Sequence, residues 1–121
     1  MAIIIAGTLD FAPGVATPMI REAKSLIDAA LEEPGCRAYS WAIDPSHPDR
    51  VNVFEEWDDE ASLAGHFAGA PYRDMGAHLN KGQGILGMAV KKYRWDIAEP
   101  VYDDSGTPRA DFFTEKGSSA S

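Results

Sequence analysis

The sequence has little that would support several large classes of function. Cys36 is its single cysteine, so an intrachain disulfide and a multi-cysteine metal site are excluded. Basic residues are few, because 11 Lys and Arg stand against 19 Asp and Glu and give a formal net charge of −8. A chain this acidic repels nucleic acid and anionic membrane surfaces, so we expect it to bind neither.

Long hydrophobic runs are also missing. No stretch is long enough to span a bilayer, and the apolar opening MAIIIAGTLDF lacks the basic segment of a signal peptide. The glycines of NKGQGILG do not lead from a strand into a helix, so they indicate no phosphate-binding loop. Together with the single cysteine, these features favour a cytoplasmic protein and give no sign of a bound cofactor.

The composition itself is that of one globular domain. Hydrophobic residues make up 45% of the 121 positions and charged residues 25%, which excludes a disordered chain and predicts a single core. We expect residues 1–98 to form this domain and residues 99–121 to form a tail, because Pro100, Gly106 and Pro108 interrupt the tail. Its apolar residues suggest that part of it docks, while the last five residues, GSSAS, should be disordered.

Hydrophobic periodicity predicts the order of the elements. Residues 2–11 and 85–97 are expected to be strands, and residues 36–44 and 50–57 a hairpin joined by the turn PSHPD. The first helix should begin at Thr17 as its cap and end at Pro34-Gly35. A second helix should follow Asp58 or Asp59 and end or bend at Gly69–Pro71, with a short helical turn and a loop after it.

This βαββαβ order predicts a ferredoxin-like α+β fold, with an antiparallel sheet and both helices on one face. The other sheet face then has no helix to cover it, although its strands carry apolar and aromatic residues. An uncovered apolar face of this kind is an association surface. We therefore expect a homodimer in which two sheets pack against each other.

Strand alternation assigns the hairpin residues to faces. Val51, Val53, Glu55 and Trp57 should share one face, and Asn52, Phe54 and Glu56 the other, while Tyr39 and Trp41 share a face of the preceding strand together with Arg37 and Ile43. Because Glu55 and Glu56 are adjacent, they point to opposite faces and cannot form a catalytic carboxylate pair.

His66 is the best candidate for a functional residue. It lies with Leu63 and Phe67 on the stripe of the second helix that should be buried, and its neighbours in the chain are small. It is either a core histidine bonded to a backbone carbonyl or to Glu56, or a base that faces a cavity. A metal site formed with His78 has little support from the spacing of the two residues.

The stretch FEEWDDEASLAGHFAGAPY, with Glu56-Trp57, following acids, and Leu63 and His66, resembles the antibiotic biosynthesis monooxygenase family, as does the strand GCRAYSWAID. The resemblance covers about residues 3–96 and implies a dimeric α+β barrel. The family includes haem-degrading members, which carry an asparagine on the first strand, a tryptophan on the second helix and a histidine ligand farther along. The asparagine and the tryptophan are missing here, and Gly76 stands near the place of the histidine ligand. Haem degradation is therefore not expected.

The resemblance implies a cofactor-independent monooxygenase that oxidises an electron-rich aromatic, such as a quinol or a polyketide. His66 would then take a phenolic proton, Trp57, Tyr72 and Tyr39 would shape the cavity, Phe67 would line it, and Asn52 would orient a substrate hydroxyl. Two alternatives remain open from the sequence. The chain could be a dimeric module that binds a small hydrophobic molecule without turnover, or its interior could be filled by side chains.

Overall fold

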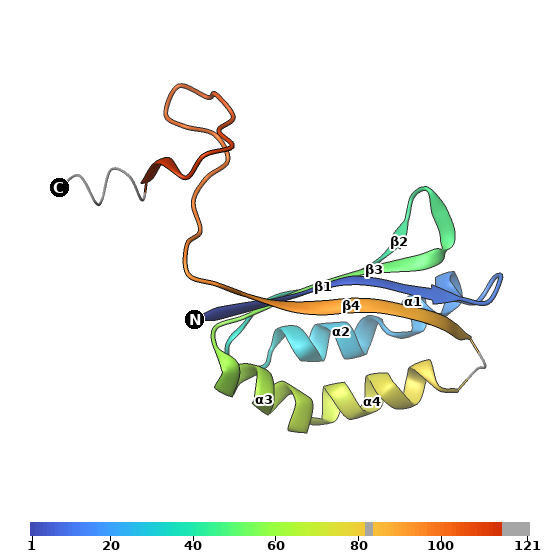
Figure 1. The fold of residues 1–121 in the computed structure, drawn as a ribbon. Helices are drawn as coiled ribbons and strands as arrows, with labels where there is room; N and C mark the ends of the chain where they lie inside the picture. Colours follow the sequence, from blue (N-terminus) through green and yellow to red (C-terminus); the bar gives the residue numbers. More distant parts are fainter. Residues whose placement is uncertain (82–83, 115–121) are drawn as a thin grey trace.

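One layer of helices covers one face of a four-stranded sheet, and a tail leads away from the sheet (Figure 1). The computed structural model describes residues 1–81 and 84–114. The elements, in chain order, are β1 (Ala2–Phe11), α1 (Ala16–Glu22), α2 (Lys24–Leu31), β2 (Cys36–Asp44), β3 (His47–Trp57), α3 (Glu60–Ala68), α4 (Ala70–Leu79) and β4 (Ile85–Trp95).

The strand order is β2-β3-β1-β4 and every pairing is antiparallel, which confirms the ferredoxin-like α+β fold. Alternation along β1 turns Ile3, Ile5, Leu9 and Phe11 toward the helices, where they are buried. The register places Ile5 between Glu55 of β3 and Lys92 of β4. The inward face of the sheet therefore carries charged side chains among apolar ones.

The first predicted helix is divided in two, and its expected cap is wrong. Ala23 separates α1 from α2, because its ψ of −2° tightens the turn and its N–H donates to both Met19 and Ile20. Val15 occupies the N-cap position without a side-chain hydrogen bond. Val15 is already helical there, so Thr17 falls inside α1 and does not cap it.

Two details of the hairpin also differ from the prediction. β3 begins at His47 rather than at residue 50, because the Asp44 carboxylate accepts the Ser46 N–H and closes the turn within two residues. The β2–β3 register shifts between Cys36 and Ala38. This bulge leaves Arg37 exposed and paired with Glu56 on the outer sheet face, instead of on the face of Tyr39.

The segment after α3 is a full helix, not the short turn that the sequence predicts. Gly69, with an extended backbone, ends α3 and precedes α4, and Pro71 suits the first turn of the new helix. Met75 is buried and Leu79 packs on the core beside Leu9 and Phe11. The glycines of this segment weaken its local helix signal, so the sequence did not indicate this packing.

The tail folds into a loop of its own beyond the sheet (Figure 1). Tyr102 pairs with Pro108, the Asp103 carboxylate accepts the N–H groups of Ser105 and Thr107, and Glu99 accepts those of Phe113 and Thr114. The loop expected at residues 82–83 and the disorder expected for residues 117–121 lie outside the described residues. Within the described part of the chain, no helix is long and apolar enough to cross a membrane.

Candidate functional site

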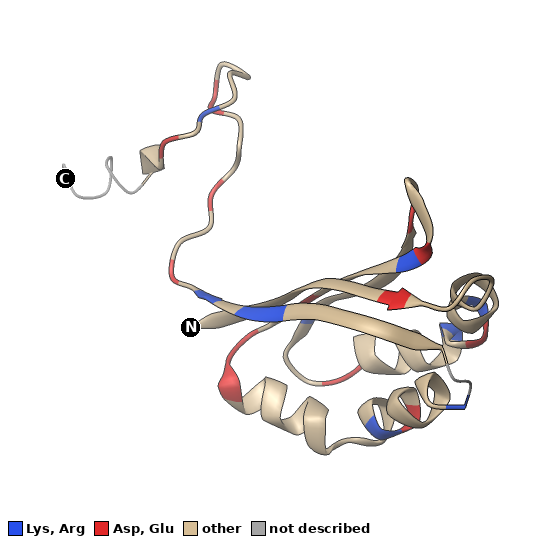
Figure 2. Cartoon of the chain, turned by 45° about the vertical axis from the view of Figure 1, so that its right-hand side comes forward, with Lys and Arg blue, Asp and Glu red and all other residues tan. Residues whose placement is uncertain are grey.

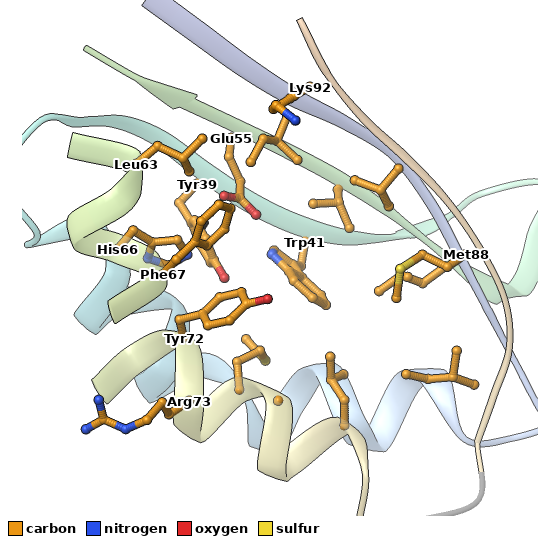
Figure 3. Close-up of a pocket in the computed structure, with 18 of the residues that line it drawn as sticks. Tyr39, Trp41, Glu55, Leu63, His66, Phe67, Tyr72, Arg73, Met88 and Lys92 are labelled. Carbon is orange, nitrogen blue, oxygen red and sulfur yellow. Dashed lines mark ion pairs between the residues drawn. The ribbon is translucent and has the colours of Figure 1, made fainter. Parts of the chain in front are cut away.

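A cavity of about 700 Å³ lies between the inward face of the sheet and the helices α3 and α4 (Figure 3). It exists because α4 packs mainly on α2 and α3 and so leaves space above the sheet. Ile5, Leu9, Val53 and Val90 form part of its sheet side. Its aromatic lining consists of Tyr39, Trp41, Phe67 and Tyr72.

His66 lies on the wall of this cavity and is surrounded by aromatic rings. Only 2% of the residue is exposed. Its ring stacks on Trp57 with centroids 4.5 Å apart, and Tyr39 and Tyr72 meet it edge-on at 5.6 and 5.5 Å. The packing fixes the plane of the imidazole, so its two nitrogens have defined neighbours.

Both nitrogens of His66 face carboxylates. Nδ1 is 2.6 Å from Oε1 of Glu33, which follows α2, and Nε2 is 4.0 Å from Oε1 of Glu55 on β3. The first distance is a short hydrogen bond, whereas the second leaves a gap that one oxygen atom of a ligand or water could bridge. The carboxylate partner of His66 is therefore Glu33, while Glu56, which the sequence offered, lies on the outer face with Arg37.

Glu55 is a buried acid whose environment disfavours its charge. Burial raises the pKa of its carboxyl, and the nearby Glu33 adds to the rise, while the indole N–H of Trp57, which donates to Oε1 at 3.1 Å, and His66 oppose it. Burial, followed by the charge of Glu55, also raises the pKa of Tyr39. Tyr39 therefore keeps its proton and can donate a hydrogen bond inside the cavity.

The structure brings four of the six predicted site residues to the cavity. His66, Tyr39, Phe67 and Tyr72 line it (Figure 3). Trp57 is fully buried behind His66, where it holds the ring and Glu55 but does not face the cavity. Asn52 lies on the outer sheet face and donates to Asp44, so its expected contact with a substrate has no support in the geometry.

Sequence reasoning missed the two carboxylates beside His66. Glu55 had a usable signal, because it is an acid among Val51, Val53 and Trp57 on the inward face of its strand. Glu33 had none, since it stands next to Glu32 in an ordinary helix-ending stretch before Pro34-Gly35. Its place in the site depends on the turn after α2, which brings it within hydrogen-bond distance of His66 on α3.

The edge of the cavity is basic although the chain is acidic. Lys91 and Lys92 of β4 belong to its lining, and Figure 2 shows the basic stretch of β4. Arg73 of α4 also borders the cavity, but its guanidinium points away and donates to the Ala68 carbonyl (Figure 3). No group of three or more His, Cys, Asp or Glu suited to hold a metal ion occurs in residues 1–81 and 84–114.

Comparisons with known proteins agree with this fold. The family model for antibiotic biosynthesis monooxygenase matches residues 2–77. A curated but uncharacterized protein of Synechocystis is 31% identical over 70 residues, which are 58% of this chain and 47% of that protein, so the match spans about half of the relative's length.

Solved structures extend the likeness to most of the chain. A conserved protein of Methanosarcina mazei is 25% identical and superposes with a TM-score of 0.70 over 79% of this chain and 94% of its own. A candidate antibiotic biosynthesis monooxygenase of Deinococcus radiodurans is 20% identical, with a TM-score of 0.72 over 85% of this chain and 100% of its own. At that identity the second likeness concerns the fold alone.

Proposed function

This chain belongs to the antibiotic biosynthesis monooxygenase family, and we propose that it is a cofactor-independent monooxygenase of an electron-rich aromatic, with His66 as the base. The observation that carries the proposal is a buried imidazole, hydrogen-bonded to a carboxylate at 2.6 Å, on the wall of an aromatic cavity. Neutral imidazole is the usual acceptor of a phenolic proton near pH 7.

The size and lining of the cavity support a flat aromatic substrate. Its volume of about 700 Å³ is in the range of small-molecule sites. Tyr39, Trp41 and Tyr72 offer ring faces for stacking and N–H or O–H groups for an oxygen of the substrate. A quinol or a hydroxylated polyketide has both the ring and the oxygens that such walls accept.

In this reaction the substrate supplies the electrons. The phenolic O–H bond breaks, its proton passes to His66, and the electron pair stays on the oxygen as phenolate, which is a far better reductant of O₂ than the phenol. One oxygen atom then enters the ring and the other leaves as water, so a quinol yields a hydroxyquinone and water. The protein holds the ring and limits water in the cavity.

Oxygen uptake with a panel of quinols tests the proposal. His66→Gln should lower the rate by about 100-fold or more, because general bases contribute on that order. His47→Gln is the matched control, since His47 is exposed at the start of β3. Equal rates in wild type and His66→Gln, with both proteins folded by circular dichroism, would remove His66 from the mechanism.

A second candidate function is binding of a small aromatic molecule without turnover. It is favoured by the tight enclosure of His66, which is 2% exposed and contacted by four rings. In that case quinols should bind under argon, and admitting air should cause no protein-dependent oxygen uptake. Uptake that depends on His66 would decide for the enzyme.

The proposal includes a homodimer formed through the outer sheet face. Phe54 and Tyr93 are 41% and 52% exposed, and the register puts them on one face with Ala6 and Ile4. Small and apolar residues at the centre of a sheet make a flat surface that a second copy can cover. A cytoplasmic location also remains a prediction, based on the lone Cys36.

A further inference from the structure

We propose that Glu33 is a positioning residue for His66, which holds the proton on Nδ1 and leaves Nε2 as the free nitrogen that faces Glu55 and the cavity. The inference rests on the proposed role of His66 as a base, but it concerns a residue that nothing in the sequence pattern marked. It predicts a state of the imidazole ring that can be measured without any substrate.

The hydrogen bond itself sets the direction of the proton. Oε1 of Glu33 is 2.6 Å from Nδ1, and the two side chains are only 15% and 1% exposed. An ionised carboxylate has lone pairs but no proton, so in a neutral ring Nδ1 must be the donor. The other nitrogen then carries the lone pair, and that nitrogen is Nε2.

Two backbone hydrogen bonds fix the position of Glu33. Its N–H donates to Ala30 and its carbonyl accepts from Cys36, each at 3.1 Å, in the turn that joins α2 to β2. Gly35 allows this turn, because its φ is +80° and a Cβ there would lie 2.0 Å from Oγ of Ser62. The turn therefore fixes the backbone of Glu33 at a point from which its side chain reaches His66 of α3.

Gly69 provides the space for the Glu33 carboxylate. A Cβ at this position would lie 2.9 Å from Oε2 of Glu33, closer than a real Cβ approaches another heavy atom. The backbone of Gly69 is extended, with φ −89° and ψ 166°, so other residues could adopt it. A side chain at residue 69 would therefore require the carboxylate end of Glu33 to shift slightly.

On the other side of the ring, Nε2 faces the Glu55 carboxylate. The distance of 4.0 Å between Nε2 and Oε1 of Glu55 is too long for a hydrogen bond, but an oxygen placed to one side of the line between them can lie about 2.8 Å from both atoms. A substrate hydroxyl placed there can pass its proton to Nε2, while its bonding pair stays on the oxygen. The imidazolium that forms would lie between two carboxylates, and its Nδ1–H would remain on Glu33.

The test is the tautomer of His66, read from long-range ¹H–¹⁵N correlations of the ring at a pH where the ring is neutral. His47→Gln and His78→Gln assign the signals. Wild type should show the Nδ1–H tautomer. Glu33→Gln, whose amide can both accept and donate, and Glu33→Ala should show a mixture or the Nε2–H form, whereas Glu33→Asp, which keeps the charge, should recover part of the original state.

Glu32→Gln is the matched control, because Glu32 is the exposed neighbour of Glu33. If a quinol is turned over, Glu33→Gln should lower kcat by about 10- to 100-fold with KM changed far less, the range found for partners that orient a metal-ligating histidine. An Nε2–H ring in wild type, or an Nδ1–H ring retained in both Glu33→Gln and Glu33→Ala, would overturn the inference. Both results are independent of oxygen uptake, so a failure of the positioning role of Glu33 can be distinguished from a failure of the monooxygenase proposal.

Discussion

Among single residues, Glu55 stands out because it is an acid in a buried position, where the charged form of its carboxyl is disfavoured. Glu55 is 6% exposed, and its carboxylate has the Trp57 N–H and the more distant Nε2 of His66 as polar neighbours. Such an arrangement costs stability, and proteins keep it where it serves binding or catalysis. The pH dependence of stability can measure that cost.

Glu55→Gln should change how stability depends on pH. Because the folded pKa of Glu55 is raised, mainly by burial, the folded state holds its proton at pH values where the unfolded state has lost it. The stabilising contribution is complete below the unfolded value of about 4.5 and is lost as pH rises through the folded value.

Glutamine keeps an oxygen for the Trp57 N–H and has no charge. Denaturant unfolding from pH 4 to 8 should therefore show a smaller loss of the free energy of unfolding with rising pH in Glu55→Gln than in wild type. Equal slopes would mean that Glu55 titrates as an ordinary exposed acid. Glu56→Gln, on the outer face, serves as the control and should leave the slope nearly unchanged.

At the scale of elements, the junction of α3 and α4 determines the site. Gly69 and Gly65 lie four residues apart and differ in what a side chain would meet. A Cβ at residue 65 meets nothing within 4 Å, whereas one at residue 69 meets Glu33 and the α3 backbone. Substituting alanine at each position compares an open helical site, residue 65, with a crowded one, residue 69.

Gly65→Ala should stabilise the protein by up to about 1 kcal/mol, because alanine is the better helix former and the position is open. Gly69→Ala should shift the end of the flexible Glu33 side chain slightly, so its effect on the tautomers of His66 should be smaller than that of Glu33→Gln. Thermal unfolding and ring ¹⁵N shifts measure the two effects. An unchanged His66 ring in Gly69→Ala would show that the carboxylate moves without losing Nδ1.

The elements also show how far the sequence can predict this protein. Periodicity in residues 2–11 and 36–57 is strong, so the strands, their order and the inward faces of Val51, Val53 and Trp57 are confirmed. The full length of α4 was not predicted, because Gly69, Pro71 and Gly76 weaken the local helix signal. The helix is stabilised by the burial of Met75 against the rest of the fold. The contact of Glu33 with His66 was not predicted for a similar reason, since the two residues lie 33 positions apart in the sequence.

For the whole molecule, we expect a dimer. Phe54→Asp should place a charge at the centre of the outer sheet face and weaken association by at least about 10-fold, because a buried unpaired charge is costly. Leu31→Asp is the control, since Leu31 is equally exposed, at 44%, but lies at the end of α2. Light scattering at micromolar protein should show twice the chain mass in wild type and control, and a monomeric wild type would contradict the barrel.

The tail from residue 99 is expected to dock on the core or on the partner chain. Val101, Tyr102 and Phe112 are 61%, 61% and 51% exposed within their own loop, although such residues usually pack. Deleting residues 99–121 should raise the dimer dissociation constant several-fold, and the double change Val101→Ser and Tyr102→Ser should reproduce part of the effect. Dimer affinity that is unaltered by the deletion would make the tail an appendage.

Binding and turnover at His66 can be measured in one sample. A quinol such as 1,4-naphthohydroquinone is titrated under argon while the ring signals of the three histidines are followed, and air is then admitted to record oxygen uptake against a protein-free blank. We expect the His66 signals to shift with the quinol while those of His47 stay, and we expect oxygen uptake to follow and to be lost in His66→Gln. A His66 ring that does not respond to any quinol, with uptake equal in wild type and His66→Gln, would contradict this expectation.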